Sequence, residues 1–448
     1  MAQPFFTNDT NIKFNNMARN NLQRARGVKD LLPQEKIARN QLIEKLREVF
    51  ELYGYNPIET PIIERYDLFA SKFGIGEESD AMKETFKLKD QGKRDLVLRT
   101  EFTMPLARYI GMNDVKLPFK RYQIGKVFRD GPIKLGRYRE FWQCDVDCIG
   151  VNNLTIDAEL IELTQNVFEQ FGLEIEIQIN NRVLLNDILE KAAVKEEERD
   201  SFIITIDKLD KIGASGVKKE LTDKGFSTKQ IKEVLEIISI KGNNEELIIK
   251  IGKKIGESDG LKNVKRVLSL VKNVDNVRFL PTLARGLAYY TGTVYEVFLK
   301  DGKEFSSSLA GGGRYDEMLS GLIGDKKDYP AIGISFGLNA IYDAMEQKKM
   351  LGNKKTVVDA YVFAVSKEEQ DYCVEVVREL RAQGIRVNSD FLGKNMKKNL
   401  EIVNNLEIPF AIIVGEEERK EGKLTIKNMK TGEQQKGTSK EVRKIIKN

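Results

Sequence analysis

The sequence contains no histidine among its 448 residues, although other polar residues are plentiful. Without an imidazole the protein has no histidine general base and no histidine metal ligand, and a Ser–His–Asp catalytic arrangement is excluded. Any chemistry must therefore use arginine, carboxylates, tyrosine, main-chain groups or bound ions. The protein also lacks the side chain whose unperturbed pKa lies closest to neutrality.

Cysteine and long apolar runs are scarce as well. The three cysteines, Cys144, Cys148 and Cys373, indicate reduced thiols rather than a disulfide framework, and two of them on one predicted strand are a weak signal for a metal site. No apolar run is long enough to span a bilayer, and the first residues lack the apolar core of a secretory signal. These absences predict a cytoplasmic protein with no membrane segment and no protein-bound metal.

What remains is an ordinary globular composition, with 41% hydrophobic and 31% charged residues and a net charge of +5. A chain of this length accommodates two or three domains. Residues 1–23 are polar and rich in asparagine, which predicts a disordered tail. Residues 24–345 combine helical and strand patterns, and within them residues 182–274 are helical and highly charged. A polar linker at 346–356 leads into 357–448, where strands and helices alternate and predict a mainly parallel sheet.

The centre of the chain predicts two paired strands, at 121–128 and 138–149, joined by a glycine- and proline-punctuated loop. Because side chains alternate along a strand, Gln143 and Asp147 face the same side of the second strand. Arg129 stands where the first strand enters the loop. A cation, an amide and a carboxylate therefore converge on one place. A solvated sheet face is the alternative, but the neighbouring aromatic residues disfavour it.

A second candidate lies at 94–111, which predicts a strand, a turn and a helix. Thr103 is expected to cap that helix, with Pro105 in its first turn. Glu101 then lies after the strand, where ligands often bind, although an exposed acid before a helix is the simpler interpretation. Further along, the triplet at 311–313 supplies glycines that allow close approach of the backbone to a ligand.

The quoted segments resemble those of a known family. VFRDGPIKLGRYREFWQCDVD is similar to motif 2 of class II aminoacyl-tRNA synthetases, and its GRYREF and QCDVD segments match the histidyl-tRNA synthetase family. YNPIETPIIERYDLF resembles motif 1, RGLAYYTG and GGGRYDEML resemble two signature segments, and residues 357–448 resemble the anticodon-binding domain. The resemblance covers residues 24–448 in the family's order. It implies an α+β class II core, an antiparallel sheet flanked by helices, with a helical insertion and a C-terminal α/β anticodon-binding domain.

The resemblance also implies a reaction and the residues that perform it. The family activates L-histidine with ATP, accompanied by Mg²⁺, and transfers histidine to the 3′ end of tRNA(His). The motif 1 segment around Pro61 implies a homodimer. The residues that would hold the α-phosphate of ATP and act in catalysis are Arg129 and Arg285. The residues that would bind histidine are Glu101, Phe102, Thr103, Gln143, Asp147, Tyr289 and Tyr290. Candidate tRNA phosphate contacts, which are equally explained as a solvated helix face, are Lys394, Lys397 and Lys398.

Three positions depart from the family pattern. Ala288 stands where the family usually has aspartate, and Asn339 and Ala340 replace the Glu-Arg pair of motif 3, whose arginine helps to hold ATP. These departures favour an alternative from another class, a non-catalytic paralogue that senses histidine or tRNA. The otherwise complete set of site residues favours the enzyme.

The missing histidines acquire a meaning from the same resemblance. An enzyme that makes histidyl-tRNA would otherwise need histidyl-tRNA for its own synthesis, and a histidine-free chain escapes that requirement. Chance or codon bias is the alternative explanation. In a reconstituted translation system depleted of histidine, this chain should be made at full length, and stalling equal to that of a histidine-containing variant would refute the hypothesis.

Overall fold

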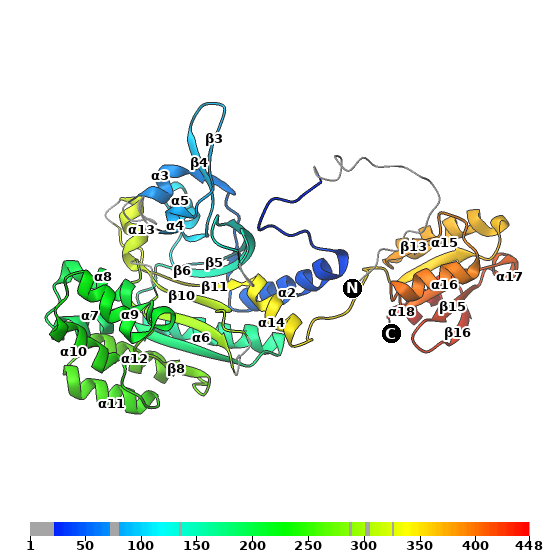
Figure 1. Ribbon diagram of the computed structural model, residues 1–448. Coiled ribbons are helices and arrows are strands. Elements are labelled where there is room, and N and C mark those ends of the chain that lie inside the picture. Colours follow the sequence, from blue (N-terminus) through cyan, green and yellow to red (C-terminus); the bar gives the residue numbers. More distant parts are fainter. Residues whose placement is uncertain are drawn as a thin grey trace. The chain divides into compact units, whose positions relative to one another are not determined.

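The computed structural model describes residues 22–71, 80–133, 137–285, 289–300, 305–324 and 327–447 (Figure 1). The chain divides into two compact units, one containing Ile43–Lys349 and the other Asp30–Leu42 together with Met350–Asn448. The predicted tail at 1–23 falls almost wholly outside the described residues. Within the described part of the chain, no helix combines the length and the apolar character needed to cross a membrane.

The first unit is built on an eight-stranded sheet, and its six central strands are antiparallel neighbours. Only the outermost pairs, β1 with β5 and β7 with β8, are parallel. The expectation of an antiparallel core sheet is confirmed. In spatial order the strands are β1 (Asn56–Pro57), β5 (Phe119–Phe128), β6 (Glu140–Ile149), β11 (Ala331–Gly337), β10 (Ala310–Arg314), β9 (Thr293–Leu299), β7 (Ile175–Asn181) and β8 (Val277–Phe279).

Two long helices cover one face of this sheet. Helix α2 (Pro33–Leu52) begins at proline, which is tolerated at a helix start, and α6 (Leu154–Phe171) ends at a left-handed glycine. The ring of Phe50 on α2 lies 5.6 Å from that of Phe336 on β11, and Phe168 on α6 lies 6.1 Å from the same ring. Because successive side chains of a strand alternate between faces, the neighbours of Phe336 point to the opposite face.

Shorter elements complete this unit. The segment at 55–69, which resembles motif 1, contributes to two different sheets and a helix. It gives β1 to the large sheet, β2 (Ile63–Arg65) to a three-stranded sheet with β4 (Asp95–Leu98) and β3 (Lys87–Lys89), and then helix α3 (Tyr66–Ala70). The remaining helices are α4 (Asp80–Lys83), α5 (Thr103–Met112), α13 (Asp316–Ile323) and α14 (Leu338–Gln347).

Six helices occupy most of the charged stretch at 182–274. They share an apolar core in which the rings of Phe202 and Phe226 meet edge to face at 4.8 Å. The helices are α7 (Arg182–Lys191), α8 (Glu196–Ile206), α9 (Leu209–Asp223), α10 (Thr228–Ile238), α11 (Asn244–Ile255) and α12 (Asp259–Leu270).

The second unit has a five-stranded sheet in the order β13-β12-β14-β15-β16. The expectation of a mainly parallel sheet was wrong for half of its pairs, because β14–β15 and β15–β16 are antiparallel. The segment at 415–423, which contains a short helix, joins β14 to β15, and a turn at 429–433 joins β15 to β16. Both connections are shorter than the dozen or more residues that a parallel crossover needs, so these pairs are antiparallel. The elements are β12 (Ala360–Ala364), η1 (Lys367–Glu369), α15 (Gln370–Ala382), β13 (Val387–Ser389), α16 (Met396–Asn405), β14 (Phe410–Val414), α17 (Glu416–Glu421), β15 (Leu424–Asn428), β16 (Gln434–Gly437) and α18 (Ser439–Lys447).

Candidate active site

One row of residues crosses the large sheet on the face opposite α2 and α6. In the strand register Asp147 on β6 pairs with Gly333 on β11, and Gly333 pairs with Gly313 on β10. A Cβ atom on Gly333 would lie 2.0 Å from Oδ1 of Asp147, and one on Gly313 would lie 2.9 Å from the ring of Tyr290. The two glycines therefore leave room for two of the predicted histidine-binding side chains.

The next row does the same for an arginine. Gly311 lies two residues before Gly313 on the same face of β10, and a Cβ atom there would lie 1.7 Å from Nη1 of Arg285. That nitrogen donates to the carbonyl oxygen of Tyr295 at 2.8 Å. Arg285 itself adopts a φ of 41°, a left-handed conformation that non-glycine residues rarely adopt and that is common at functional sites. The glycine triplet was expected to allow a ligand to approach the backbone. In the structure Gly311 and Gly313 make room for the side chains of Arg285 and Tyr290.

Asp147 is part of a buried polar cluster. Its carboxylate forms an ion pair with Nη2 of Arg121, directly opposite on β5, at 2.6 Å, and it accepts a hydrogen bond from the hydroxyl of Tyr315. Arg121 is completely buried. Burial raises the pKa of Asp147, and Arg121 and Tyr315 oppose that rise. Sequence reasoning missed Arg121, which is the first residue of the predicted strand at 121–128 and pairs with Asp147 in the strand register.

Asp145 is a second carboxylate that the sequence prediction passed over. It lies two residues before Asp147 on the same face of β6 and accepts a hydrogen bond from the hydroxyl of Ser335. Burial raises its pKa to about 7, and the nearby Asp147 adds to this rise while Arg121 opposes it. The signal was present in the alternation of β6, but alternation alone does not distinguish a pocket residue from a solvated one.

Gln143 lies four residues before Asp147 on the same face of β6. Its Oε1 is buried and has no hydrogen-bond partner among the described residues. A buried amide oxygen without a partner costs free energy unless a ligand or water satisfies it. The arrangement therefore provides an acceptor for a donor group of a substrate.

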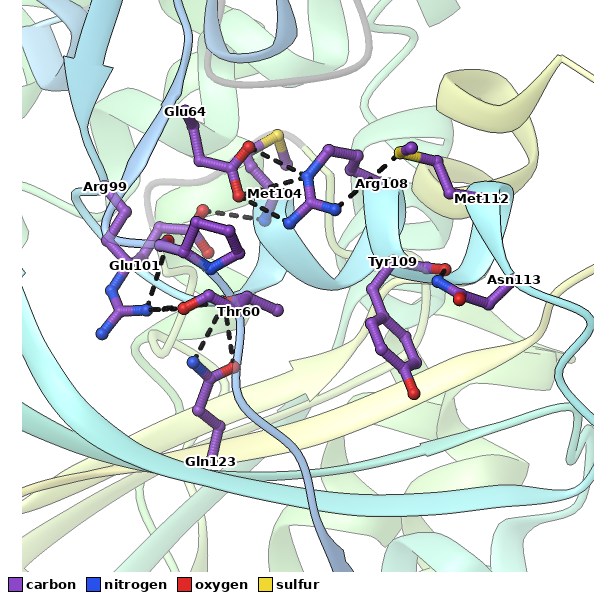
Figure 2. A network of polar contacts seen from close by, with 11 residues as sticks. Thr60, Glu64, Arg99, Glu101, Met104, Arg108, Tyr109, Met112, Asn113 and Gln123 are labelled. Atoms are coloured by element: carbon purple, nitrogen blue, oxygen red, sulfur yellow. Dashed lines mark hydrogen bonds and ion pairs between the residues drawn. The ribbon is translucent and has the colours of Figure 1, made fainter.

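Glu101 reaches the site from the loop between β4 and α5 (Figure 2). Its carboxylate accepts hydrogen bonds from the main-chain N–H groups of Thr103 and Met104, the latter at 2.8 Å. Burial raises the pKa of Glu101, and these hydrogen bonds oppose the rise. The expectation that Thr103 caps α5 was wrong, because Phe102 occupies the cap position without a side-chain hydrogen bond and Glu101 satisfies the first N–H groups instead.

Arg129 follows the last residue of β5, as the sequence predicted. Its Nε donates to the carbonyl oxygen of Thr100 at 3.1 Å, and its guanidinium lies 5.2 Å from the centre of the Phe141 ring. These two contacts orient the group, and within the described residues they leave its Nη atoms for an anion. A planar guanidinium suits a phosphate because it donates two parallel hydrogen bonds.

These side chains line one cavity of about 340 Å³. Every predicted ATP- or histidine-binding residue lines it except Phe102, which is fully buried beside Arg99. The rings of Tyr289 and Tyr290 lie 4.9 Å apart on its wall. The lining residues that sequence reasoning did not single out include Glu84, Thr100, Met104, Arg137, Asp145, Tyr315, Ile334 and Ser335.

The structure describes two of the three positions that depart from the family pattern, Asn339 and Ala340. Ala288 lies outside the described residues. Asn339 is buried at the start of α14, where its Oδ1 accepts a hydrogen bond from the main-chain N–H of Trp142 at 3.2 Å, and Ala340 follows it. Neither Asn339 nor Ala340 lines the cavity within the described part of the chain, whereas a third arginine, Arg137, does.

The lysines proposed for tRNA lie in the second unit. Lys397 and Lys398 are exposed in the first turn of α16, and Lys394 is half-buried just before it. The helix N-terminus is capped by Asn395, whose side chain accepts from the N–H of Lys398. The three cations thus lie together at one helix start, in keeping with either a phosphate contact or a solvated face.

The antiparallel sheet with its polar cavity and a separate C-terminal α/β unit define the class. This is a class II aminoacyl-tRNA synthetase fold. Comparisons with known proteins specify it further. The family model described as histidyl-tRNA synthetase matches residues 27–341, and that described as anticodon binding domain matches residues 359–448.

Individual relatives agree with the family models. A protein of Shouchella clausii named histidine–tRNA ligase 2 is 42% identical over 424 residues, which cover 92% of this chain and 97% of that relative. One of Bacillus cereus named histidine–tRNA ligase 1 is 39% identical over 422 residues, covering 92% and 94%. The crystal structure of histidyl-tRNA synthetase from Nostoc sp. PCC 7120 matches with a TM-score of 0.81 and 29% identity, covering 95% of this chain and 99% of that one. The chain belongs to the histidyl-tRNA synthetase family.

Proposed function

We propose that this protein is a histidine–tRNA ligase that converts L-histidine and ATP to histidyl-adenylate and pyrophosphate and then transfers histidine to tRNA(His). The observation that carries the proposal is a cavity lined by three arginines, four acids, one amide and three tyrosines. The chain has no need of a covalent intermediate. Its contribution is to position the reactants and to stabilise developing charge.

The acidic end of the cavity binds histidine. Asp147 is held by Arg121 and Tyr315 and accepts an N–H of the imidazole, while Gln143 offers its unpartnered oxygen to another donor of the substrate. Glu101 attracts the α-ammonium group. Because these polar groups are buried, an apolar analogue of histidine would leave them unpaired and should be rejected strongly.

The basic end of the cavity binds ATP. Arg129 and Arg285 contact the α-phosphate and neutralise the negative charge that grows on it as the histidine carboxylate attacks. Arg137 lines the same cavity and supplies positive charge in a site where motif 3 carries Asn339 and Ala340. Mg²⁺ would enter the site with ATP, and the phosphates would provide most of the ligands of the ion.

Assembly and tRNA contacts complete the proposal. The segment after Pro61 exposes two adjacent apolar side chains, with Ile62 43% and Ile63 50% exposed, and pairing of this segment between two copies would form a homodimer. Lys394, Lys397 and Lys398 contact tRNA phosphates. A protein that charges tRNA for translation works in the cytoplasm.

Histidine-dependent exchange of pyrophosphate into ATP tests the function directly. The purified protein should catalyse exchange with L-histidine and not with other amino acids, and it should then aminoacylate tRNA(His). Binding of histidine or tRNA without any exchange would instead establish the non-catalytic sensor that Asn339 and Ala340 favour. Sedimentation at micromolar concentration should give twice the 51.1 kDa mass of one chain.

A further inference from the structure

A buried arginine ties the loop that carries Glu101 to a distant part of the chain (Figure 2). Arg99 is 4% exposed. Its Nη1 donates to the carbonyl oxygen of Thr60 at 2.6 Å and to that of Pro61 at 3.3 Å, and its Nε donates to the carbonyl oxygen of Lys126 at 2.9 Å. One guanidinium therefore joins the end of β4, the segment before β2, and strand β5.

Main-chain and ring contacts reinforce this junction. The N–H of Arg99 donates to the carbonyl oxygen of Ile62 at 2.9 Å, and its carbonyl accepts from the N–H of Phe128 at 3.0 Å. Its guanidinium lies 4.7 Å from the centre of the Phe102 ring. Glu101 stands between these two residues, so the side chains on both sides of it are fixed.

The chemistry of these contacts indicates that Arg99 fixes the geometry of the loop and adds little to the stability of the fold. None of the three acceptors is a carboxylate, and burial lowers the pKa of Arg99. A buried cation that is held by neutral carbonyls recovers only part of its desolvation cost. An apolar side chain would fill the same space, but it could not hold three separate carbonyls in one arrangement.

A second contact joins the same two regions. Arg108 on α5 forms an ion pair with Glu64 on β2 at 2.8 Å, and Glu64 is buried. The N-terminus of α5 is capped by Glu101 itself. The Glu101 loop and the helix that follows it are thus both anchored to residues 60–65.

We propose that Arg99 is a positioning residue for histidine binding: it fixes the loop from Thr100 to Met104 against Thr60 and Pro61, so that Glu101 keeps its place in the cavity. The proposal rests on the proposed function, because it assigns Glu101 to the histidine α-ammonium. It adds a residue that touches no substrate and that acts only through the loop. Its consequence is larger for histidine than for ATP. Of the two arginines assigned to ATP, Arg129 touches this loop only through the carbonyl oxygen of Thr100 at 3.1 Å, and Arg285 is held by the carbonyl oxygen of Tyr295 instead.

The test compares KM for histidine with KM for ATP in pyrophosphate exchange, using the full chain. Arg99→Met should raise KM for histidine by roughly 10- to 100-fold, the loss expected for hydrogen bonds of a charged group, with KM for ATP changed less than about threefold. Arg99→Lys keeps the charge with fewer hydrogen-bond donors, so its KM for histidine should lie between those of the unmodified protein and Arg99→Met. Arg182→Met is the matched control, because Arg182 is also 4% exposed but lies in the helical stretch with Asp200 as its partner.

A milder variant keeps the test decisive if Arg99→Met does not fold. A Cβ atom on Gly125 would lie 3.0 Å from Nη2 of Arg99 and 3.4 Å from the Phe102 ring, so Gly125→Ala should displace the guanidinium by a few tenths of an ångström without removing it. It should raise KM for histidine by roughly two- to tenfold. Equal changes in both KM values, or no change in either variant, would overturn the proposal. Absence of histidine-dependent exchange in the unmodified protein would instead refute the proposed function.

Discussion

The two ends of the cavity use arginine in opposite ways. At the acidic end Arg121 is completely buried and is paired with Asp147 at 2.6 Å. At the basic end Arg129 and Arg285 donate to main-chain carbonyls, and no carboxylate within the described residues forms an ion pair with either. The charge of Arg121 is neutralised by Asp147, so this arginine organises the pocket, whereas Arg129 and Arg285 line the cavity with their charge available to an anion. The comparison predicts that losing Arg121 impairs stability and that losing Arg285 impairs the reaction.

Of the changes considered, the loss of Arg121 should have the largest effect, a decrease in the free energy of unfolding. Arg121→Met leaves Asp147 buried and unpaired, and loss of one partner of a buried ion pair costs about 3–5 kcal/mol in the free energy of unfolding. Denaturant unfolding measures it. Arg182→Met should cost much less, since the side chain of its partner Asp200 is 63% exposed. Equal losses in the two variants would show that Arg121 is not specially coupled to Asp147.

Removing a functional arginine should spare stability and impair the reaction. Arg285→Ala should slow histidyl-adenylate formation by roughly 100- to 1,000-fold, because one preorganised charge donor is lost from the transition state. The rate of pyrophosphate exchange at saturating histidine and ATP checks this expectation. The control Arg278→Ala removes an exposed arginine from β8 and should leave the rate unchanged. A near-normal rate in Arg285→Ala would remove this residue from the phosphate end.

The acidic end can be altered without removing its volume. Asp147→Asn removes the negative charge that we propose for binding the imidazole N–H. We expect KM for histidine to rise by roughly 10- to 100-fold, while KM for ATP stays within about threefold. Steady-state exchange kinetics at varied histidine and ATP check this, with Asp200→Asn as an exposed control. An unchanged histidine KM would place the imidazole elsewhere.

The smallest effect concerns pH. The pKa of Asp145 is raised to about 7 in the folded protein, whereas an unfolded chain has an aspartate pKa of about 3.9. Between these values the folded state binds the extra proton, so its stability falls as pH rises and levels off above about 7. Asp145→Asn does not titrate, and its Tm relative to the unmodified protein should therefore increase from pH 4 to pH 7. We expect this difference in Tm to increase by about 2–4 °C over that pH range. The exposed control Asp67→Asn should show no such trend.

Local patterns predicted the parts of the site that depend on local geometry. The strand containing Gln143 and Asp147 was predicted from alternation, and Arg129 was placed at the strand end from the loop that follows. The same reasoning passed over Arg121 and Asp145, because alternation assigns a face but not the burial of that face. Thr103 was given the capping role because its type favours it, yet the carboxylate of Glu101 competes for the same N–H groups and takes them.

The sequence by itself determined the chemistry available to this protein: no imidazole, a set of arginines and acids in a fixed order, and strands whose periodicity places them on one face. Only the tertiary structure decided which glycine seats which side chain. Gly311, Gly313 and Gly333 receive Arg285, Tyr290 and Asp147, and these partners come from loops and strands up to 186 residues apart, as for Gly333 and Asp147. The register of neighbouring strands sets those contacts, and register depends on pairing between distant segments, which no local pattern encodes.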